Sequence, residues 1–194
     1  MNRVRKIAVT GVLAALTVVL GITGIGFVTW FPGVSLTIMH VPVLIGAILE
    51  GPIVGTFVGL LFGLFSLIQA SIIAVNPGDL AFINPLISVV PRLFIGPATY
   101  AVYILIKGQS MSSRREYGAM IIGSIAGSLV NTVLVLGMLG VFKIYPWTVI
   151  AGVALTNGPI EAVFAAVLVA TVLSMWHVLS WGKNRSRLSK EALK

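Results

Sequence analysis

Residues 84–106 read NPLISVVPRLFIGPATYAVYILI, an apolar segment that is long enough to cross a lipid bilayer and contains one charged residue, Arg92. Placing a charged side chain at the centre of a bilayer costs roughly 2.5–3.5 kcal/mol on insertion scales. Arg92 therefore needs an internal partner, a water-filled cavity or a ligand. Pro91 and Pro97 interrupt the expected helix, and interrupted helices at membrane depth often border cavities because the freed backbone groups need partners.

The composition of the whole chain is that of an integral membrane protein. Of its 194 residues, 58% are hydrophobic and only 9% are charged, whereas a soluble domain carries about 25% charged residues. The net charge of +8 comes from basic residues gathered at the two ends and in the segment 107–115. This distribution is typical of membrane topology signals rather than of nucleic-acid binding. The absence of cysteine excludes disulfides and thiolate metal sites.

Apolar segments separated by polar, Pro- or Gly-containing turns predict a single domain, residues 1–194, built as a bundle of six transmembrane helices. The expected helices are residues 6–28, 36–49, 53–74, 84–106, 117–142 and 148–181. The first segment is longer than the apolar region of a signal peptide, so we expect a retained helix. Because the basic segments then fall on one side, the positive-inside rule places both termini in the cytoplasm.

Small residues form a face on the first expected helix. Ala8, Gly11 and Ala15 recur at three- and four-residue spacing, which lets another helix approach closely. The partner is either a helix of the same chain or a separate subunit. Gly55, Gly59 and Gly63 form a similar face on the third expected helix, and there we expect packing inside the bundle.

Four polar residues lie within the apolar helices, and helix rise places them at middle or outer membrane depths. They are Arg92, Asn131, Asn157 and Glu161. One interpretation is an internal Arg92–Glu161 ion pair with the asparagines bridging helices. The other is a pocket open to the outside, in which Arg92 binds an anionic or carbonyl group. We favour the pocket, because intramembrane ionisable residues are functional sites by default.

Three further polar residues are candidates for the same pocket. His40 lies near the outer end of the second expected helix, Gln69 toward the outer end of the third, and Asn84 begins the fourth. A lone histidine of this kind is either a structural residue or a ligand contact. The sequence contains no glycine-rich phosphate loop, no metal-ligand pairing and no nucleophile beside a base. We therefore expect no catalysis, metal or cofactor in this chain, and an ATP-driven transporter would need its ATPase in another chain.

Several motifs, in order along nearly the whole chain, resemble the substrate-binding S components of energy-coupling-factor (ECF) vitamin transporters. They are VRKIAVTGVLAAL (4–16), TIMHVPVLIGA (37–47) followed by EGP (50–52), GLLFGL (59–64), NPL (84–86), VPRLFIG (90–96), NTVLVLG (131–137) and NGPIEA (157–162). Gly11 stands where alanine is usual in the family, a departure that keeps the close approach. Among the subgroups, the combination is most similar to the pantothenate type.

The resemblance implies a six-helix bundle in the bacterial cytoplasmic membrane that binds a vitamin from outside. Loops between helices one and two and between three and four would cap the site. The small face of Ala8, Gly11 and Ala15 would dock on a transmembrane T component, which works with two cytosolic ATPases that use the ATP. Toppling of the bundle in the membrane would release the vitamin inside.

Pantothenate suits the polar residues, because its carboxylate matches a bidentate contact with Arg92. Its hydroxyls and amide match Asn131 and Asn157, with His40 or Gln69 as further partners. Folate, cobalamin and hydroxymethylpyrimidine remain alternative substrates. A small membrane enzyme that uses Glu161 or His40 as an acid or base is an alternative of another class. A stand-alone secondary transporter is disfavoured, because the short chain shows no paired repeat halves.

Overall fold

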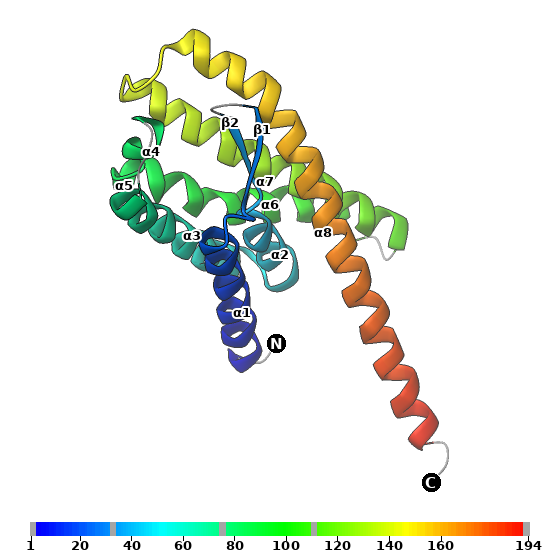
Figure 1. Cartoon of the computed structure of the whole chain (residues 1–194). Helices are drawn as coiled ribbons and strands as arrows, with labels where there is room; N and C mark the ends of the chain where they lie inside the picture. The colour runs from blue at the N-terminus through cyan, green and yellow to red at the C-terminus, as the bar shows by residue number, and fades with distance from the viewer. Residues whose placement is uncertain (1–2, 32–33, 74–76, 110–111, 192–194) are drawn as a thin grey trace.

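Five long apolar helices frame the molecule (Figure 1). The computed structural model describes residues 3–31, 34–73, 77–109 and 112–191. Within these ranges the helices long and apolar enough to cross a membrane are Arg3–Ile22, Pro52–Ile73, Pro85–Lys107, Arg114–Val141 and Trp147–Trp176, and Val41–Glu50 is a shorter apolar helix. The predicted helical fold is confirmed. The helix Val41–Glu50, which corresponds to the second predicted helix, is however too short for a full span of about 20 residues.

The elements follow one another along the chain as eight helices and two strands in the described part of the molecule. They are α1 (Arg3–Ile22), β1 (Phe27–Phe31), β2 (Val34–Thr37), α2 (Val41–Glu50), α3 (Pro52–Ile73), α4 (Pro77–Ala81), α5 (Pro85–Ser88), α6 (Val90–Lys107), α7 (Ser113–Val141) and α8 (Trp147–Glu191). The C-terminal part of α8 extends away from the bundle (Figure 1).

The β1–β2 hairpin corrects the sequence prediction for the first two helices. Helix α1 ends at Ile22 rather than at residue 28, and α2 begins at Val41 rather than at residue 36. Gly24 adopts a φ of +73°, a left-handed conformation that ends a helix. Beyond it, FVTWF and VSLT are rich in β-branched and aromatic residues, which favour strands once the chain has left the helix. The turn predicted at residues 32–33 lies outside the described residues.

The two strands pair antiparallel, with Phe27 opposite Thr37 and Val28 opposite Leu36. The last strand residue, Thr37, is followed by Ile38, whose N–H donates to the carbonyl of Gly26 at 3.0 Å. The hairpin therefore closes at its base, directly before α2 begins.

Helix α2 is the buried centre of the bundle. Nine of its ten residues are buried, and only Leu49 is not. A helix that is apolar all round is expected to be buried on every side. It ends at Gly51, whose φ of +99° allows the sharp turn into α3. Its length of about 15 Å leaves it shorter than a bilayer, and its neighbours rather than lipid surround it.

Helices α3 and α6 are in close contact along the glycine face of α3, as the sequence predicts. A Cβ atom at Gly55 would lie 2.8 Å from the Cα of Gly96, and one at Gly63 would lie 2.7 Å from the Cα of Val89. At Gly59 the atom that a Cβ would meet is the carbonyl oxygen of Arg92. Because these glycines have no side chains, the backbone at Arg92 packs directly against α3. This contact fixes the position of Arg92 in the bundle.

The fourth predicted helix, residues 84–106, is divided into α5 and α6 at Val89. Asn84 caps the first piece, because its Oδ1 accepts from the N–H of Leu86 at 3.0 Å. The division follows from Pro91, which has no N–H to donate to a carbonyl four residues earlier. The predicted helix boundaries at residues 117 and 181 are also wrong, since α7 begins at Ser113 and α8 ends at Glu191.

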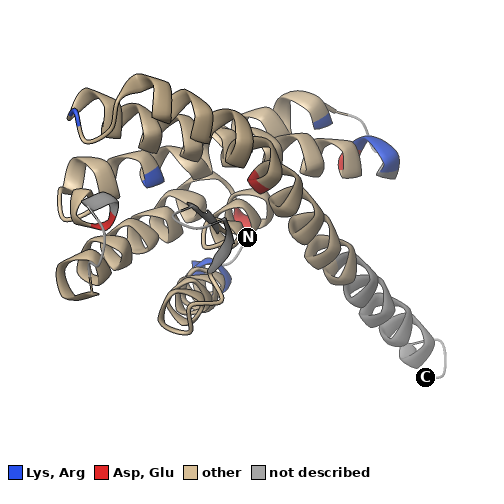
Figure 2. Cartoon of the chain, turned by 45° about the horizontal axis from the view of Figure 1, so that its top comes forward, with Lys and Arg blue, Asp and Glu red and all other residues tan. Residues whose placement is uncertain are grey.

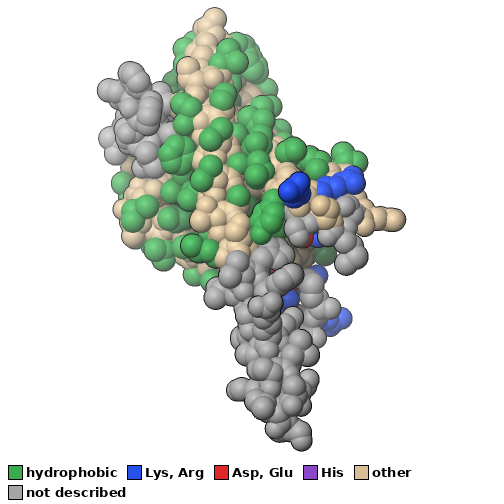
Figure 3. Space-filling view, turned by 90° about the vertical axis from the view of Figure 1, so that its right-hand side faces the viewer, with side chains coloured by type: hydrophobic (Ala, Val, Ile, Leu, Met, Phe, Trp, Pro, Cys, Tyr) green, Lys and Arg blue, Asp and Glu red, His purple; other side chains and the backbone are tan. Residues whose placement is uncertain are grey.

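The outer surface is apolar over most of its described area. Charged residues are few along the described ribbon (Figure 2), and hydrophobic side chains cover much of the face in Figure 3. Leu105 and Leu155, for example, are 79% and 77% exposed. Apolar surface of this extent suits contact with lipid rather than with water.

Candidate binding site

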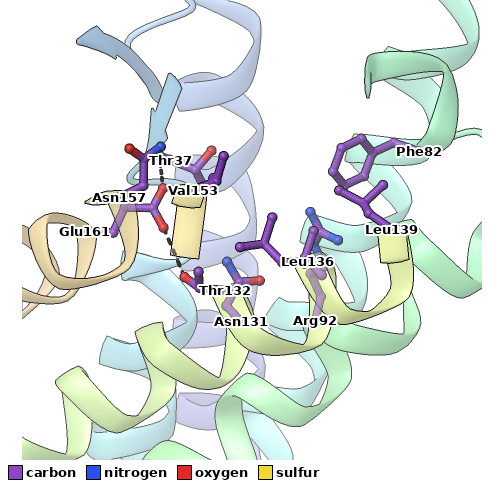
Figure 4. Close-up of a pocket in the computed structure, with 11 residues that line it drawn as sticks. Thr37, Phe82, Arg92, Asn131, Thr132, Leu136, Leu139, Val153, Asn157 and Glu161 are labelled. Atoms are coloured by element: carbon purple, nitrogen blue, oxygen red, sulfur yellow. Dashed lines mark hydrogen bonds between the residues drawn. The ribbon is translucent and has the colours of Figure 1, made fainter. Parts of the chain in front are cut away.

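A cavity of about 170 Å³ lies among the end of β2, α6, α7 and α8. Its lining residues are Thr37, Phe82, Arg92, Asn131, Thr132, Val135, Leu136, Leu139, Val153, Asn157 and Glu161. All four polar residues that the sequence places at membrane depth are among them (Figure 4). The helices therefore bring Arg92, Asn131, Asn157 and Glu161 to one site.

The backbone break before α6 holds the side chain of Arg92. In a regular helix the carbonyl of Ile87 would accept from the N–H of residue 91, but that residue is proline. The Nη1 of Arg92 donates to this freed carbonyl at 2.6 Å. The guanidinium also lies 4.9 Å from the ring centre of Phe82 and 5.2 Å from that of Phe62, within cation–π range. Arg92 is only 5% exposed, so its cation is held in a largely desolvated position.

Glu161 has partners other than Arg92. Its Oε1 accepts from the backbone N–H of Thr37 at 2.7 Å, and its Oε2 accepts from the hydroxyl of Thr132 at 3.2 Å. Figure 4 shows Glu161 and Thr37 at one end of the cavity and Arg92 with Phe82 at the other. Arg92 and Glu161 form no ion pair in the structure, so that sequence-based alternative is wrong.

Two buried polar atoms at the cavity lack a hydrogen-bond partner in the described protein. They are the Nε of Arg92, a donor, and the Oδ1 of Asn131, an acceptor. Leaving such a buried group unpaired costs about 1–3 kcal/mol. Both residues line the cavity, but the two atoms themselves have almost no accessible surface, so a ligand with one acceptor and one donor would satisfy both only once the side chains turn toward the cavity. Asn157, which is partly buried, presents a further amide to the same space.

The other three sequence candidates do not line this cavity. His40 occupies the N-cap position of α2, is 1% exposed and has both ring nitrogens without a hydrogen-bond partner in the described chain. Gln69 lies on α3 and is partly buried. Asn84 caps α5. The cavity thus gives no support for direct ligand contacts by these residues.

Part of the cavity wall lies outside the residues that the sequence singles out. Two series of residues at four-residue spacing are a signal for part of this wall, because such residues share a helix face. They are Asn131, Val135 and Leu139 on α7, and Val153, Asn157 and Glu161 on α8. Thr132 and Leu136 form a second pair of this kind. No comparable signal marks Thr37, the last residue of β2, or Phe82, which follows α4.

The small face on α1 points away from the bundle. Ala8, Gly11 and Ala15 are exposed, and a Cβ at Gly11 would meet nothing within 4 Å. The buried residues of α1 are instead Leu13, Ala14, Thr17 and Gly21. Of the two interpretations of this face, packing inside the same chain is therefore wrong.

The chain belongs to the substrate-specific components of ECF transporters. The family described as "ECF transporter, substrate-specific component" matches residues 5–173, which confirms the resemblance seen in the motifs. The chain is therefore a multi-pass membrane protein and a non-catalytic transporter subunit. Among similar proteins is the "Pantothenic acid transporter PanT" of Lactococcus lactis subsp. cremoris (strain MG1363). The two chains are 27% identical over 192 residues, a match that covers 89% of this chain and 93% of the relative.

Proposed function

We propose that the chain binds pantothenate in the cavity between β2, α6, α7 and α8. The observation that carries the proposal is the pair of unpartnered atoms, a cationic donor on Arg92 and an amide acceptor on Asn131. A carboxylate would accept from Arg92 in a charge-assisted hydrogen bond. A hydroxyl or amide N–H of the same molecule would donate to Asn131. The similarity to a pantothenic acid transporter supports the same substrate.

The remaining lining residues suit a small molecule with an apolar middle. Val135, Leu136 and Leu139 supply an aliphatic wall, and pantothenate carries two methyl groups on the carbon between its two hydroxyl-bearing carbons. The cavity volume of about 170 Å³ is below the roughly 300–1,000 Å³ of sites for drug-sized ligands. That volume disfavours folate and cobalamin, which are much larger. Hydroxymethylpyrimidine is small enough but offers no carboxylate to Arg92.

In the membrane, the chain acts as the binding subunit of a larger importer. Its partners are a transmembrane T component and two cytosolic ATPases, which use ATP on its behalf. The exposed face of Ala8, Gly11 and Ala15 is the surface that docks on the T component. Both termini lie in the cytoplasm, and the substrate enters the cavity from outside. The short α2 and the five long helices together make up the six-helix bundle.

Binding of radiolabelled pantothenate to the purified chain tests the proposed substrate. We expect saturable binding at micromolar concentration or below, competed by unlabelled pantothenate and not by folate, cobalamin or hydroxymethylpyrimidine. Mass spectrometry of the small molecule that co-purifies provides an independent identification. A chain that is folded and monodisperse but retains a different vitamin would refute pantothenate as the substrate.

A further inference from the structure

Glu161 connects three elements of the fold around one carboxylate. The residue lies on α8 and is 9% exposed. One oxygen accepts from the N–H of Thr37 at the end of β2, and the other accepts from the hydroxyl of Thr132 on α7. Both interactions are drawn as dashed lines in Figure 4. Glu161 thus links the hairpin to α8 and α7, and the shorter of its two bonds, at 2.7 Å, is the one to the hairpin.

The geometry of the hairpin makes the Thr37 N–H available for this link. The N–H of Ile38 donates to Gly26 and so points toward β1. Successive residues of a strand direct their N–H groups to opposite sides. The N–H of Thr37 therefore faces away from β1 and toward α8. The bond to Glu161 is an attachment of the hairpin to the helices and no part of the strand pairing.

We propose that Glu161 is a positioning residue that holds the β1–β2 hairpin as a wall of the cavity. Thr37 lines the cavity and is bonded to Glu161, so release of this bond frees one wall. The carboxylate then controls how often the cavity opens and makes no direct contact with the substrate. A negative charge here would also repel an anionic group, which favours the Arg92 end for the substrate carboxylate. The effect on substrate exchange rests on the proposed function, but the attachment of the hairpin does not.

Amide hydrogen exchange of the ligand-free, full-length protein in detergent tests the attachment. In Glu161→Leu, which has no acceptor, amides of residues 26–31 and 34–38 should exchange about tenfold faster, equivalent to about 1.4 kcal/mol. Glu161→Gln keeps one acceptor oxygen and should restore most of the protection. Thr37→Pro removes the donor without removing a strand-pairing bond and should match Glu161→Leu. Thr37→Val retains the N–H and serves as the matched control, with exchange as in the unaltered chain.

Unchanged hairpin exchange in both Glu161→Leu and Thr37→Pro would overturn the proposal. If one of these two variants does not fold, exchange in the other at the hairpin relative to α6 and α7 decides, because the attachment predicts an increase confined to the hairpin. The dissociation rate of radiolabelled pantothenate should rise by a similar factor in Glu161→Leu. Absence of pantothenate binding by the unaltered chain would refute the proposed substrate and leave the exchange result, measured without ligand, standing.

Discussion

Replacing Arg92 with methionine should remove the preference of the protein for an acid over the matching alcohol. Pantothenate and panthenol differ only at the end that we place beside the guanidinium, where one has a carboxylate and the other a hydroxymethyl group. Arg92→Met keeps an apolar side chain between Phe62 and Phe82 but removes the cation. The two ligands and the two proteins therefore form a cycle that isolates the contact between charge and carboxylate.

The magnitude follows from the burial of Arg92, which is 5% exposed. Truncating one member of a buried, hydrogen-bonded charge pair costs about 2–5 kcal/mol, which corresponds to a loss of about 30- to 5,000-fold in affinity. We expect panthenol to bind the unaltered chain more weakly than pantothenate by a factor in this range. In Arg92→Met, the affinities for the two ligands should become equal within about threefold, equivalent to about 0.7 kcal/mol.

Equilibrium binding of radiolabelled pantothenate, with panthenol as competitor, measures all four affinities. Arg92→Met also leaves the carbonyl of Ile87 without its donor, so size-exclusion elution and thermal unfolding must show that the variant is folded. Gln69→Leu is the matched control. It exchanges a polar residue of α3 that does not line the cavity, and its affinity should be unchanged. A folded Arg92→Met variant that still prefers pantothenate over panthenol would refute the placement of the carboxylate.

Four other substitutions test the packing, the docking surface and the polar wall. Gly59→Leu should prevent the close contact of α3 and α6 and lower the unfolding temperature, because even a Cβ there meets backbone. Gly11→Trp should leave pantothenate affinity unchanged but abolish co-purification with the T component. Asn131→Leu should weaken binding by about fivefold or more, the equivalent of a hydrogen bond of about 1 kcal/mol. Arg5→Ala should lower thermal stability, since it leaves the buried carboxylate of Glu50 without its partner at 2.7 Å.

The packing variant and the ion-pair variant have matched controls. Gly152→Ala, at an open position on α8, should not destabilise, and an equal loss in both glycine variants would count against specific packing. Normal transport by Gly11→Trp would reject the docking surface. For the ion pair, adding Glu50→Gln to Arg5→Ala should recover part of the stability. Unaltered pantothenate affinity in Asn131→Leu would remove that residue from the site.

Much of the candidate site could be predicted because a charged side chain at membrane depth needs a partner, a water-filled cavity or a ligand. An arginine within residues 84–106 needs a partner or a ligand, and Asn157 and Glu161 share a face through their four-residue spacing. The structure brings these residues to one cavity. Helix periodicity likewise predicts the inward-facing Gly55, Gly59 and Gly63, because missing side chains at this spacing produce a groove.

The sequence by itself determined the membrane class, the long apolar helices and the polar residues at membrane depth. These properties depend on composition and local periodicity, which require no knowledge of distant contacts. Only the tertiary structure decided that Ile22 ends the first helix, that the β1–β2 hairpin follows it and that Glu161 bonds Thr37 rather than Arg92. Thr37 and Glu161 are 124 positions apart, and local pattern carries no information on which donor a buried carboxylate meets across that separation. Packing of α8 against β2 makes that choice.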